Sequence, residues 1–383
     1  MVRALETVKI YWSKCLVGHK DPFYIKTSLE TILNIFWMKS FFSVLLVATV
    51  LPTWATDTKS IASLTAFQGA EAHQRLIDEA KKEGSLVVYT SISGPVSQRL
   101  QTKFEEKYGF KIKLWRAGDR PVLQRVTSES KTNIPGVDVI NIGTLEMEIL
   151  HREKLLQPVE SSFASELIPG AMAPHREWVS TFVNVVVQAY NTDKVKKSEL
   201  PKTFQDLLDP KWKGRLGIEG SDEEWFYAIV NSMGQEKGLK YFRDLVATNG
   251  LSVRNGHSLL NNLIVAGEVP LGIGAYVNMA DASKKKGAPI DYVLLDPTFA
   301  VSFSMGIAAK PMHPHAALLF YEYMLTDGQK VFADMDYFPT RKDIETPFKH
   351  IKYEMVNKGV FLDVFDKWSD LWDETIIKNG KRE

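Results

Sequence analysis

The stretch SLVVYTSISGPVSQRLQTKFEEKYGFKIKLW, residues 85–115, contains three successive patterns. Residues 86–89 form a short apolar run of the kind that is buried on both faces of a parallel sheet. Residues 111–115 have the composition of a second strand. Between these runs, apolar residues recur with the spacing of one helix face at Val96, Leu100, Phe104 and Tyr108. A strand, a helix and a strand in this order predict an α/β protein with a mostly parallel sheet.

The same alternation continues along the chain. Two α/β blocks are joined near residues 178–183 and again near 297–302. Because a pair of short strands can bend while each block stays rigid, we predict two lobes and a two-strand hinge. The predicted boundaries are 72–180 and 300–383 for lobe 1, and 181–299 for lobe 2. The cleft between two such lobes is a common place for a ligand. The last helical segment, 360–377, is predicted to pack against a lobe.

The N-terminal region has the features of a secretory signal peptide. Lys39 precedes the apolar run 41–51, and small and polar residues follow from Pro52 onward. The run is shorter than the roughly 20 residues that span a bilayer, although an uncleaved anchor is the alternative. Met38 stands where such a peptide begins. Residues 1–55 are therefore predicted to be an upstream extension followed by a signal peptide at about 38–55.

Composition narrows the class of protein further. The net charge of +1 is too small to indicate binding to the negatively charged backbone of a nucleic acid. The only cysteine, Cys15, lies in the upstream extension, so no cysteine follows the apolar run to carry a lipid. An exported chain without thiols suits an oxidising compartment. We therefore expect a soluble periplasmic protein rather than a lipoprotein, and a monomer.

Four segments resemble a known family. They are LLDPKWKGR at 207–215, AGEVPLG at 266–272, HAALLF at 315–320 with TDGQK at 326–330, and FPTR at 338–341. Over roughly residues 70–345 the chain resembles ABC-transporter solute-binding proteins of the ferric-iron-binding type. The resemblance implies a type II periplasmic-binding fold. It also implies capture of a small-molecule solute and its delivery to an ABC transporter permease in the inner membrane.

The chain departs from this family where iron would bind. Ferric-iron binders carry two adjacent tyrosines after the PLG strand, whereas here Tyr276 is followed by Val277. Many members also have a histidine in the turn after the first strand, and residues 90–93 contain none. We therefore expect a small organic solute, with no cofactor and no metal. Ferric iron is the alternative.

Candidate binding residues in the first lobe follow its predicted strands. Ser91 and Ser93 lie at the end of a parallel strand and the start of a helix, where free N–H groups attract anions. Alternatively, Ser93 could serve as the N-cap of that helix without contacting a ligand. Arg116 follows the next strand and could fork onto a carboxylate or phosphate, with a surface ion pair as the competing interpretation.

In the second lobe, Asp222 begins a helix and could accept a hydrogen bond from a solute amine or hydroxyl. The neighbouring Glu223 is expected only to complement the helix dipole. Trp225 could stack on a ligand or belong to the core.

Two further groups follow in the second lobe. His257 and Ser258 lie in a turn before another helix. Tyr276 and Asn278 stand at the end of a strand, and Tyr276 is the contact that we rank first. These candidates predict an anionic solute, or a zwitterion that also uses Asp222.

Other functions compete with transport. A periplasmic enzyme is the rival class, but the sequence has no G-x-S-x-G elbow, no H-E-x-x-H helix, no P-loop and no G-x-G-x-x-G after a strand. We therefore predict no enzyme activity and no catalytic residue. A receptor or chemosensory subunit built on the same clamp is a third possibility.

Overall fold

The computed structural model describes residues 70–132 and 136–382. The chain divides into compact units at residues 1–58 and 59–383, and all described residues belong to the second unit. The predicted upstream extension, signal peptide and Cys15 lie outside the described residues. Of the helices in the described part, none combines the length and apolar character needed to cross a bilayer.

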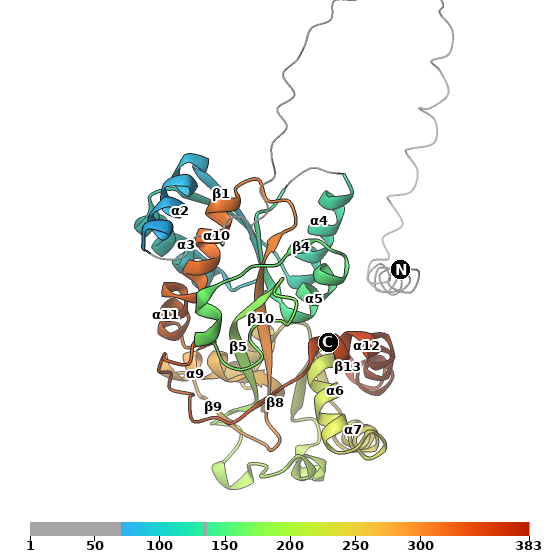
Figure 1. Ribbon diagram of the computed structural model, residues 1–383. Coiled ribbons are helices and arrows are strands. Elements are labelled where there is room, and N and C mark those ends of the chain that lie inside the picture. Colours follow the sequence, from blue (N-terminus) through green and yellow to red (C-terminus); the bar gives the residue numbers. More distant parts are fainter. Residues whose placement is uncertain (1–69, 133–135, 383) are drawn as a thin grey trace, which may run out of the picture. The chain divides into compact units, whose positions relative to one another are not determined.

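Strands and helices alternate along the described chain, as predicted (Figure 1). The strands are β1 Ser85–Thr90, β2 Lys111–Arg116, β3 Val139–Gly143, β4 Leu156–Gln157, β5 Val179–Asn191, β6 Leu216–Glu219, β7 Ser252–Arg254, β8 Leu271–Tyr276, β9 Ile290–Val293, β10 Phe299–Ala308, β11 Phe338–Pro339, β12 Glu354–Met355 and β13 Lys381–Arg382. The helices are α2 Ala70–Glu83, α3 Gly94–Tyr108, α4 Asp119–Lys131, α5 Thr144–Arg152, α6 Glu223–Ser232, α7 Gln235–Asn249, α8 His257–Ala266, α9 Val277–Lys285, α10 Pro314–Leu325, α11 Asp327–Asp334 and α12 Lys358–Trp372.

Within the described residues these strands form one 13-stranded mixed sheet, in the path order β13-β7-β6-β8-β5-β10-β3-β1-β2. The β1 strand pairs in parallel with β2 and β3, and β6 pairs in parallel with β7 and β8. Between these two parallel sets, β5 and β10 run antiparallel to each other and to their neighbours on this path, β8 and β3. The prediction of mostly parallel strands therefore holds for the two ends of the sheet but not for its centre.

The long strand β5 joins the two ends of the sheet. All of its residues are buried. Its first half pairs with β10 and its second half with β8. Val179 and Phe182 belong to a cluster with Leu100 and Phe104. Alternate residues from Val183 to Ala189 belong to a cluster with Leu260 and Ile264. One continuous strand thus serves two hydrophobic cores, and the lobe boundaries remain a prediction.

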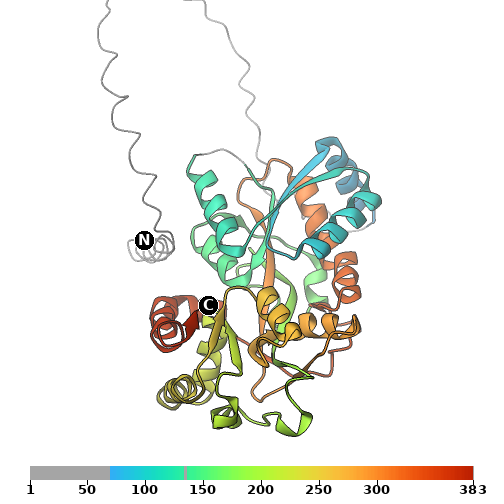
Figure 2. The ribbon, with the colours of Figure 1, turned by 180° about the vertical axis from the view of Figure 1, so that it is seen from behind.

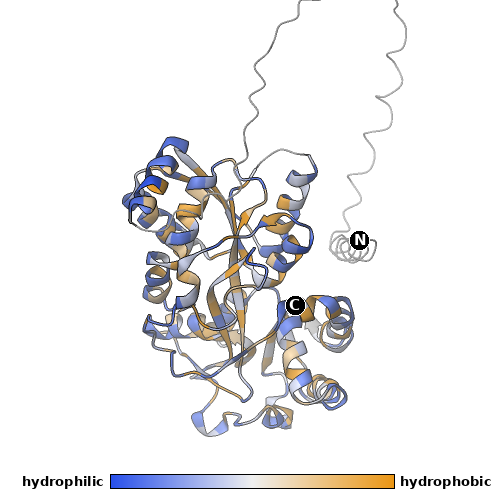
Figure 3. Ribbon diagram, viewed as in Figure 1, coloured by the Kyte–Doolittle hydropathy of each residue, from blue (hydrophilic) through white to orange (hydrophobic). Residues whose placement is uncertain are grey.

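Helices cover the faces of this sheet. In Figures 1 and 2, α2, α3 and α10 lie on one side of β1, and α4 and α5 lie on the other. Helices α6, α7 and α12 gather beside the far end of the sheet. Apolar residues concentrate on the strands and on the inner faces of the helices (Figure 3). Burial of each large apolar side chain contributes roughly 1.5–3 kcal/mol to this packing.

The helix α5 was not predicted from the sequence. Its buried side chains include Thr144, Glu146 and Glu148 beside Met147 and Leu150. Polar residues therefore occupy positions where a helix normally shows an apolar stripe. The pattern was hidden because this helix carries its carboxyl groups toward the interior.

The C-terminal helix α12 is the predicted amphipathic tail. Its aromatic side chains Phe361, Phe365, Trp368 and Trp372 are buried, whereas Val360 is exposed. The helix contacts both α5 and α6. It therefore lies against elements from both sides of the central strands.

Candidate functional site

The turn between β6 and α6 is held by Glu219. Its carboxylate accepts hydrogen bonds from the Ser221 backbone N–H at 2.6 Å and from the Gly256 backbone N–H at 2.8 Å. The Ser221 hydroxyl donates to the same group. Glu219 is 3% exposed, and its hydrogen bonds tie the start of α6 to the loop before α8.

Asp222, His257 and Tyr276 meet above this turn. The Nε2 atom of His257 lies 3.2 Å from the Oδ1 atom of Asp222. The imidazole stacks on the Tyr276 phenol ring, with centroids 3.7 Å apart. These residues come from the start of α6, the start of α8 and the end of β8, so the fold assembles one group from three chain segments.

Two polar atoms of this group are buried without a hydrogen-bond partner among the described residues. They are Oδ2 of Asp222 and Nδ1 of His257. Asp222 is 8% exposed. A buried polar atom left unpaired costs roughly 1–3 kcal/mol, and such atoms are uncommon in folded proteins. Both atoms therefore lack the hydrogen bond that a buried polar atom normally makes.

Further carboxyl groups surround Asp222. Together with Asp222, five of them influence one another or the same neighbours, and we call these six groups the acidic cluster: Asp119, Glu146, Glu219, Asp222, Glu223 and Glu224. Arg120 lies 3.6 Å from Glu223, and the Lys358 ammonium pairs with Glu224. Counting these two cations and His257, the cluster has more potential negative than positive charge.

Burial and crowding raise the pKa values of several of these carboxyls. Burial raises the pKa of Glu146 to about 8, and the charge of Asp119 acts in the same direction. Burial raises the pKa of Glu223 to about 7, against the opposing effect of Arg120. Burial raises the pKa of Asp222 to about 6, while His257 opposes the rise. A bound cation would favour the ionised form of each group.

His257 and Tyr276 respond to the same field. Burial alone would lower the pKa of His257, but the carboxylates of Asp222 and Glu219 outweigh it and raise that pKa. Burial, together with repulsion from the carboxylates, raises the pKa of Tyr276 well above its usual range. The same carboxylates therefore favour the protonated form of both the imidazole and the phenol.

The predicted first-lobe residues lie at the carboxyl ends of β1 and β2. The Ser91 hydroxyl is buried and has no hydrogen-bond partner in the described part of the chain. Ser93 does not cap α3 through its side chain, and its hydroxyl lies 3.2 Å from the Tyr337 hydroxyl. Arg116 is exposed, and its Nε donates to the Ile92 carbonyl at 2.7 Å.

Three other predicted residues have different surroundings. Trp225 is 3% exposed and packs between Phe204 and Phe242, so it belongs to the core. Ser258 is exposed on α8. Asn278 is 3% exposed in the first turn of α9, and its Oδ1 is unpaired within the described residues.

Sequence reasoning missed several members of the acidic cluster. Glu146 lies on the unpredicted α5, and Lys358 comes from a segment more than 130 residues from its partner Glu224. Glu223, expected only to complement the helix dipole, is 8% exposed and also pairs with Arg120. Asp119 accepts a hydrogen bond from the Gly143 N–H at 2.8 Å, so it links two strand ends. The three consecutive acidic residues at 222–224 were the one signal in the sequence.

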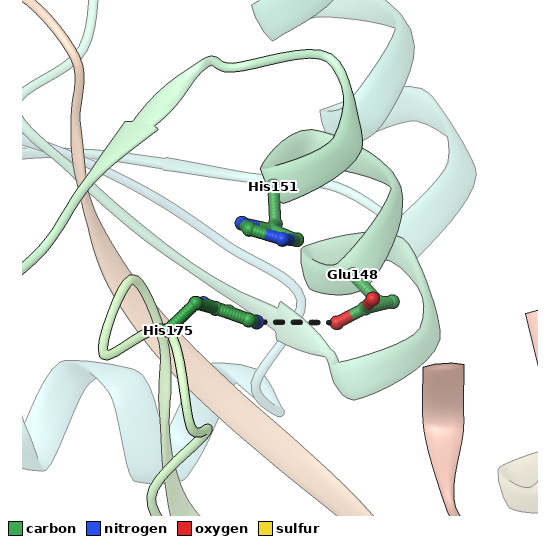
Figure 4. Close-up of side chains that lie close together, drawn as sticks. All are labelled: Glu148, His151 and His175. Carbon is green, nitrogen blue, oxygen red and sulfur yellow. Dashed lines mark hydrogen bonds and ion pairs between the residues drawn. The ribbon is translucent and has the colours of Figure 1, made fainter. Parts of the chain in front are cut away.

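A second polar group lies between α5 and the segment that leads into β5. Figure 4 shows Glu148 and His151 on α5 facing His175. The two imidazole rings stack with centroids 3.5 Å apart and planes 6° apart. Glu148 accepts from the Trp178 indole N–H at 3.1 Å and lies 3.4 Å from Nε2 of His175. Nδ1 of His151 lies 2.8 Å from Glu177.

The hydrogen bonds of this second group argue for a structural role. Nδ1 of His175 accepts from the Glu177 backbone N–H at 3.1 Å, which assigns the proton of the neutral ring to Nε2. That proton is directed to Glu148. Burial lowers the pKa of His175, and the charge of His151 acts the same way. In-plane lone pairs of two parallel rings do not converge on one ion, so the ring arrangement does not suit shared metal ligation.

Solved structures with this fold are binding proteins. The chain matches iron-bound HitA from Pseudomonas aeruginosa with a TM-score of 0.67 and 20% identity, covering 76% of this chain and 99% of that one. It also matches AfuA from Actinobacillus pleuropneumoniae, solved with fructose-6-phosphate, with a TM-score of 0.67 and 21% identity over 77% of this chain and 99% of that one. The fold is that of type II periplasmic binding proteins.

A family model described as bacterial extracellular solute-binding protein matches residues 147–358, more than half of the chain. The protein belongs to this family, whose members bind solutes and do not act as enzymes. The protein is a solute-binding component of ABC import.

Curated relatives are about a quarter identical to the chain over the aligned residues. The Fe(3+)-binding periplasmic protein of Serratia marcescens is 25% identical over 264 residues, 66% of this chain and 77% of that protein. A putative 2-aminoethylphosphonate-binding periplasmic protein of Salmonella typhimurium is 23% identical over 288 residues, which cover 72% of this chain and 81% of that protein. The match to iron uptake protein A1 of Synechocystis sp. is 25% identical over 215 residues, 55% of this chain and 59% of that protein. The chain thus spans less than two thirds of that relative.

Proposed function

We propose that this protein captures a small organic solute that carries a protonated amine, and that Asp222 binds the amine. The observation that carries the proposal is the buried Oδ2 atom of Asp222, which has no hydrogen-bond partner in the part of the chain that the structure describes. An ammonium group would donate a hydrogen bond to this atom and would offset the excess negative charge of the acidic cluster. A charge-assisted hydrogen bond of this kind is roughly twice as strong as a neutral one.

A second part of the site accepts the anionic end of the solute. The Ser91 hydroxyl, which is buried and unpaired within the described residues, lies near the start of α3, where backbone N–H groups favour anions. Ser93 and Arg116 follow on the same sheet edge. These features support a zwitterion, with its anion toward Ser91 and its ammonium at Asp222. We therefore rank a zwitterion first and a purely anionic solute second, whereas the sequence favoured an anionic solute.

Capture works through the closure of two lobes. The strands β5 and β10 pass between the two hydrophobic cores and are suited to bend as a two-strand hinge. A solute that touches both lobes stabilises the closed state because it binds that state more tightly. The closed periplasmic monomer then delivers the solute to an ABC permease.

Ferric iron is the second candidate. The ligand atoms of Glu219, Asp222 and His257 lie within 4.8 Å of one another, and carboxylates are hard ligands. Two features count against iron. Both oxygens of Glu219 already accept hydrogen bonds, and the neighbouring Tyr276 has a raised pKa that opposes phenolate formation.

Thermal unfolding of the purified protein with a defined set of solutes tests the proposal. The set contains 2-aminoethylphosphonate, free amino acids, the N-acetylated form of each, fructose-6-phosphate and ferric citrate. At a solute concentration one hundred times the dissociation constant, stabilisation should be about 2.7 kcal/mol. We expect an amine to stabilise the protein and its acetylated form to have no effect.

Two variants complete this test. Asp222→Asn should abolish the stabilisation, whereas Asp244→Asn, which changes an exposed carboxylate paired with Lys240, should leave it intact. Stabilisation by ferric citrate alone, or full amine binding by Asp222→Asn, would show that the proposed solute class is wrong.

A further inference from the structure

The helix α3 begins after a serine whose side chain does not cap it. Ser93 is the N-cap residue, and the side chain of an N-cap serine typically accepts a hydrogen bond from the second or third helical N–H. The second helical residue is Pro95, which has no N–H, so the third residue, Val96, is the remaining donor for such a cap. The Ser93 side chain makes no cap hydrogen bond. The Val96 N–H is therefore left without the cap that the sequence offers it.

The position of Tyr337 accounts for the missing cap. Its hydroxyl lies 3.2 Å from the Ser93 hydroxyl, which is within hydrogen-bond distance, and either group can be the donor. The Ser93 carbonyl still accepts from the Ser97 N–H at 2.9 Å, so the backbone of the helix starts normally. Because a side chain occupies one rotamer at a time, the hydroxyl that is turned toward Tyr337 is turned away from the Val96 N–H.

Packing and an ion pair hold Tyr337 in place. The residue is 9% exposed, and its ring meets the Phe182 ring edge to face with centroids 4.9 Å apart. Its backbone N–H donates to the Phe332 carbonyl at 2.9 Å. The preceding residue, Asp336, pairs with Lys285 of α9. Contacts with β5, α11 and α9 therefore make the phenol the fixed member of its hydrogen bond with the serine.

The turn before α3 carries the other donors that we propose for the solute anion. The Ser91 hydroxyl is buried and unpaired within the described residues, and Arg116 is held at the turn by its 2.7 Å hydrogen bond to the Ile92 carbonyl. Burial raises the pKa of Tyr337, and the Ser93 hydrogen bond and the charge of Arg116 only oppose this rise. The phenol is therefore neutral at neutral pH and does not repel an anion.

We propose that Tyr337 is a positioning residue of the solute site. By holding the Ser93 hydroxyl, Tyr337 keeps the Val96 N–H free for the anionic end of the solute. This inference rests on the proposed function, in which that anion lies near Ser91 at the start of α3. An uncapped N–H at a helix start attracts an anion because the aligned peptide dipoles add to its partial positive charge.

Loss of the Tyr337 hydroxyl changes the competition for this N–H. In Tyr337→Phe the Ser93 hydroxyl has lost its phenol partner and is free to turn to the Val96 N–H. A solute anion would then have to displace an intramolecular hydrogen bond, which lowers its affinity. Removal of the Ser93 hydroxyl as well should release the N–H again. This rescue separates positioning from packing, because a packing defect would persist in the double variant.

Calorimetric titration with 2-aminoethylphosphonate measures the effect. We expect Tyr337→Phe to raise the dissociation constant roughly tenfold, as for the loss of one hydrogen bond to a charged group. Tyr337→Phe combined with Ser93→Ala should bind as tightly as Ser93→Ala alone. Tyr323→Phe is the matched control and should bind like the wild-type protein. It removes a hydroxyl from the same core, one that donates to the Leu100 carbonyl at 3.3 Å.

Hydrogen exchange of the Val96 amide tests the same point without a solute. In Tyr337→Phe the Ser93 hydroxyl should protect this N–H, so that it exchanges more slowly than in the wild-type protein. Tyr337→Phe combined with Ser93→Ala should restore the faster exchange. An unchanged exchange rate in Tyr337→Phe, or an equal loss of affinity in the single and double variants, would overturn the proposal.

Ethylphosphonate, which lacks the amine, separates this inference from the proposed function. If the wild-type protein binds it as tightly as 2-aminoethylphosphonate and Tyr337→Phe weakens both, amine capture at Asp222 is contradicted and the role of Tyr337 is supported. If binding requires the amine but Tyr337→Phe leaves the affinity unchanged, the inference about Tyr337 alone is overturned. If neither compound binds to any of these proteins, both proposals are overturned.

Discussion

Gly274 and Asp222 approach each other so closely that a side chain at residue 274 would displace the carboxylate. A Cβ atom built on Gly274 would lie 2.6 Å from Oδ2 of Asp222, and Gly274 has a φ of +79°. This strand residue therefore has two reasons to be glycine: its left-handed backbone conformation and the position of a buried carboxylate.

Gly274→Ala should weaken binding of the proposed amine at least tenfold, because the new methyl group pushes Asp222 away. Backbone strain should also destabilise the fold by roughly 1–2 kcal/mol. Gly287→Ala is the control, since Gly287 has a φ of +83° and a Cβ atom added there would meet no neighbouring atom within 4 Å. Calorimetry and thermal unfolding separate the two effects. Equal loss of affinity in both variants would contradict the role of the contact.

Glu146→Gln should stabilise the protein at pH 8 and have little effect at pH 4.5. The pKa of Glu146 is about 8 in the fold and near 4.5 when the chain is unfolded. The folded state therefore holds an extra proton between these values, and stability is lost as the pH rises through 8. We expect the unfolding temperature at pH 8 to rise by about 3–6 °C.

Calorimetric scans across this pH range measure the effect. Glu236→Gln, on an exposed residue in the first turn of α7, is the control and should not change the pH dependence. A Glu146→Gln variant with the wild-type pH profile would show that the Glu146 carboxyl is ionised in the fold.

His313→Gln should reduce stability more at pH 5.5 than at pH 8.5. Nδ1 of His313 lies 2.8 Å from the fully buried Asp138, and this hydrogen bond raises the pKa of His313. Its contribution is therefore complete below pH 6.5 and is lost as the pH rises through the raised value. We expect about 1 kcal/mol of difference between the two pH values.

Urea unfolding at both pH values measures this difference. His350→Gln, at an exposed position, provides the comparison. A loss of stability in His313→Gln that is independent of pH would mean that the imidazole is not charged in the fold.

Trp225→Leu should destabilise the fold by roughly 1–3 kcal/mol and leave solute affinity within about twofold of the wild-type value. The Trp225 ring lies 5.9 Å from Phe242 and 6.2 Å from Phe204, measured between centroids, and the residue is buried. Chemical unfolding and calorimetry test the two parts. Unchanged stability with a large loss of affinity would assign Trp225 to the solute site instead.

Sequence patterns predicted most of the strands and helices because their apolar periodicities are strong. The spacing of Val96, Leu100 and Phe104 predicted α3, and these side chains are buried in the first core. The pattern failed at α5, where buried Glu146 and Glu148 replace the expected apolar residues. It also gave no sign that β5 and β10 would unite the strands in a single mixed sheet, since strand pairing depends on contacts between distant segments.

The candidate site was also predicted only in part from the sequence. Asp222, His257 and Tyr276 were all predicted from their places at strand ends and helix starts. The environment of Asp222 was not, because it includes Glu224, which also interacts with Glu146 from α5 and with Lys358 from α12. The helical spacing of Trp225 fits a ligand contact or a core position equally well, and only its packed neighbours decided between them.

The sequence by itself determined the α/β class, the order of elements and the family resemblance, because apolar spacing and short motifs are local properties of the chain. The tertiary structure decided which carboxyl groups lie close enough to influence one another, and which atom of Asp222 is left unpaired within residues 70–132 and 136–382. Electrostatic interactions act through space, so the charge that each group carries depends on neighbours that the chain brings together only when it folds.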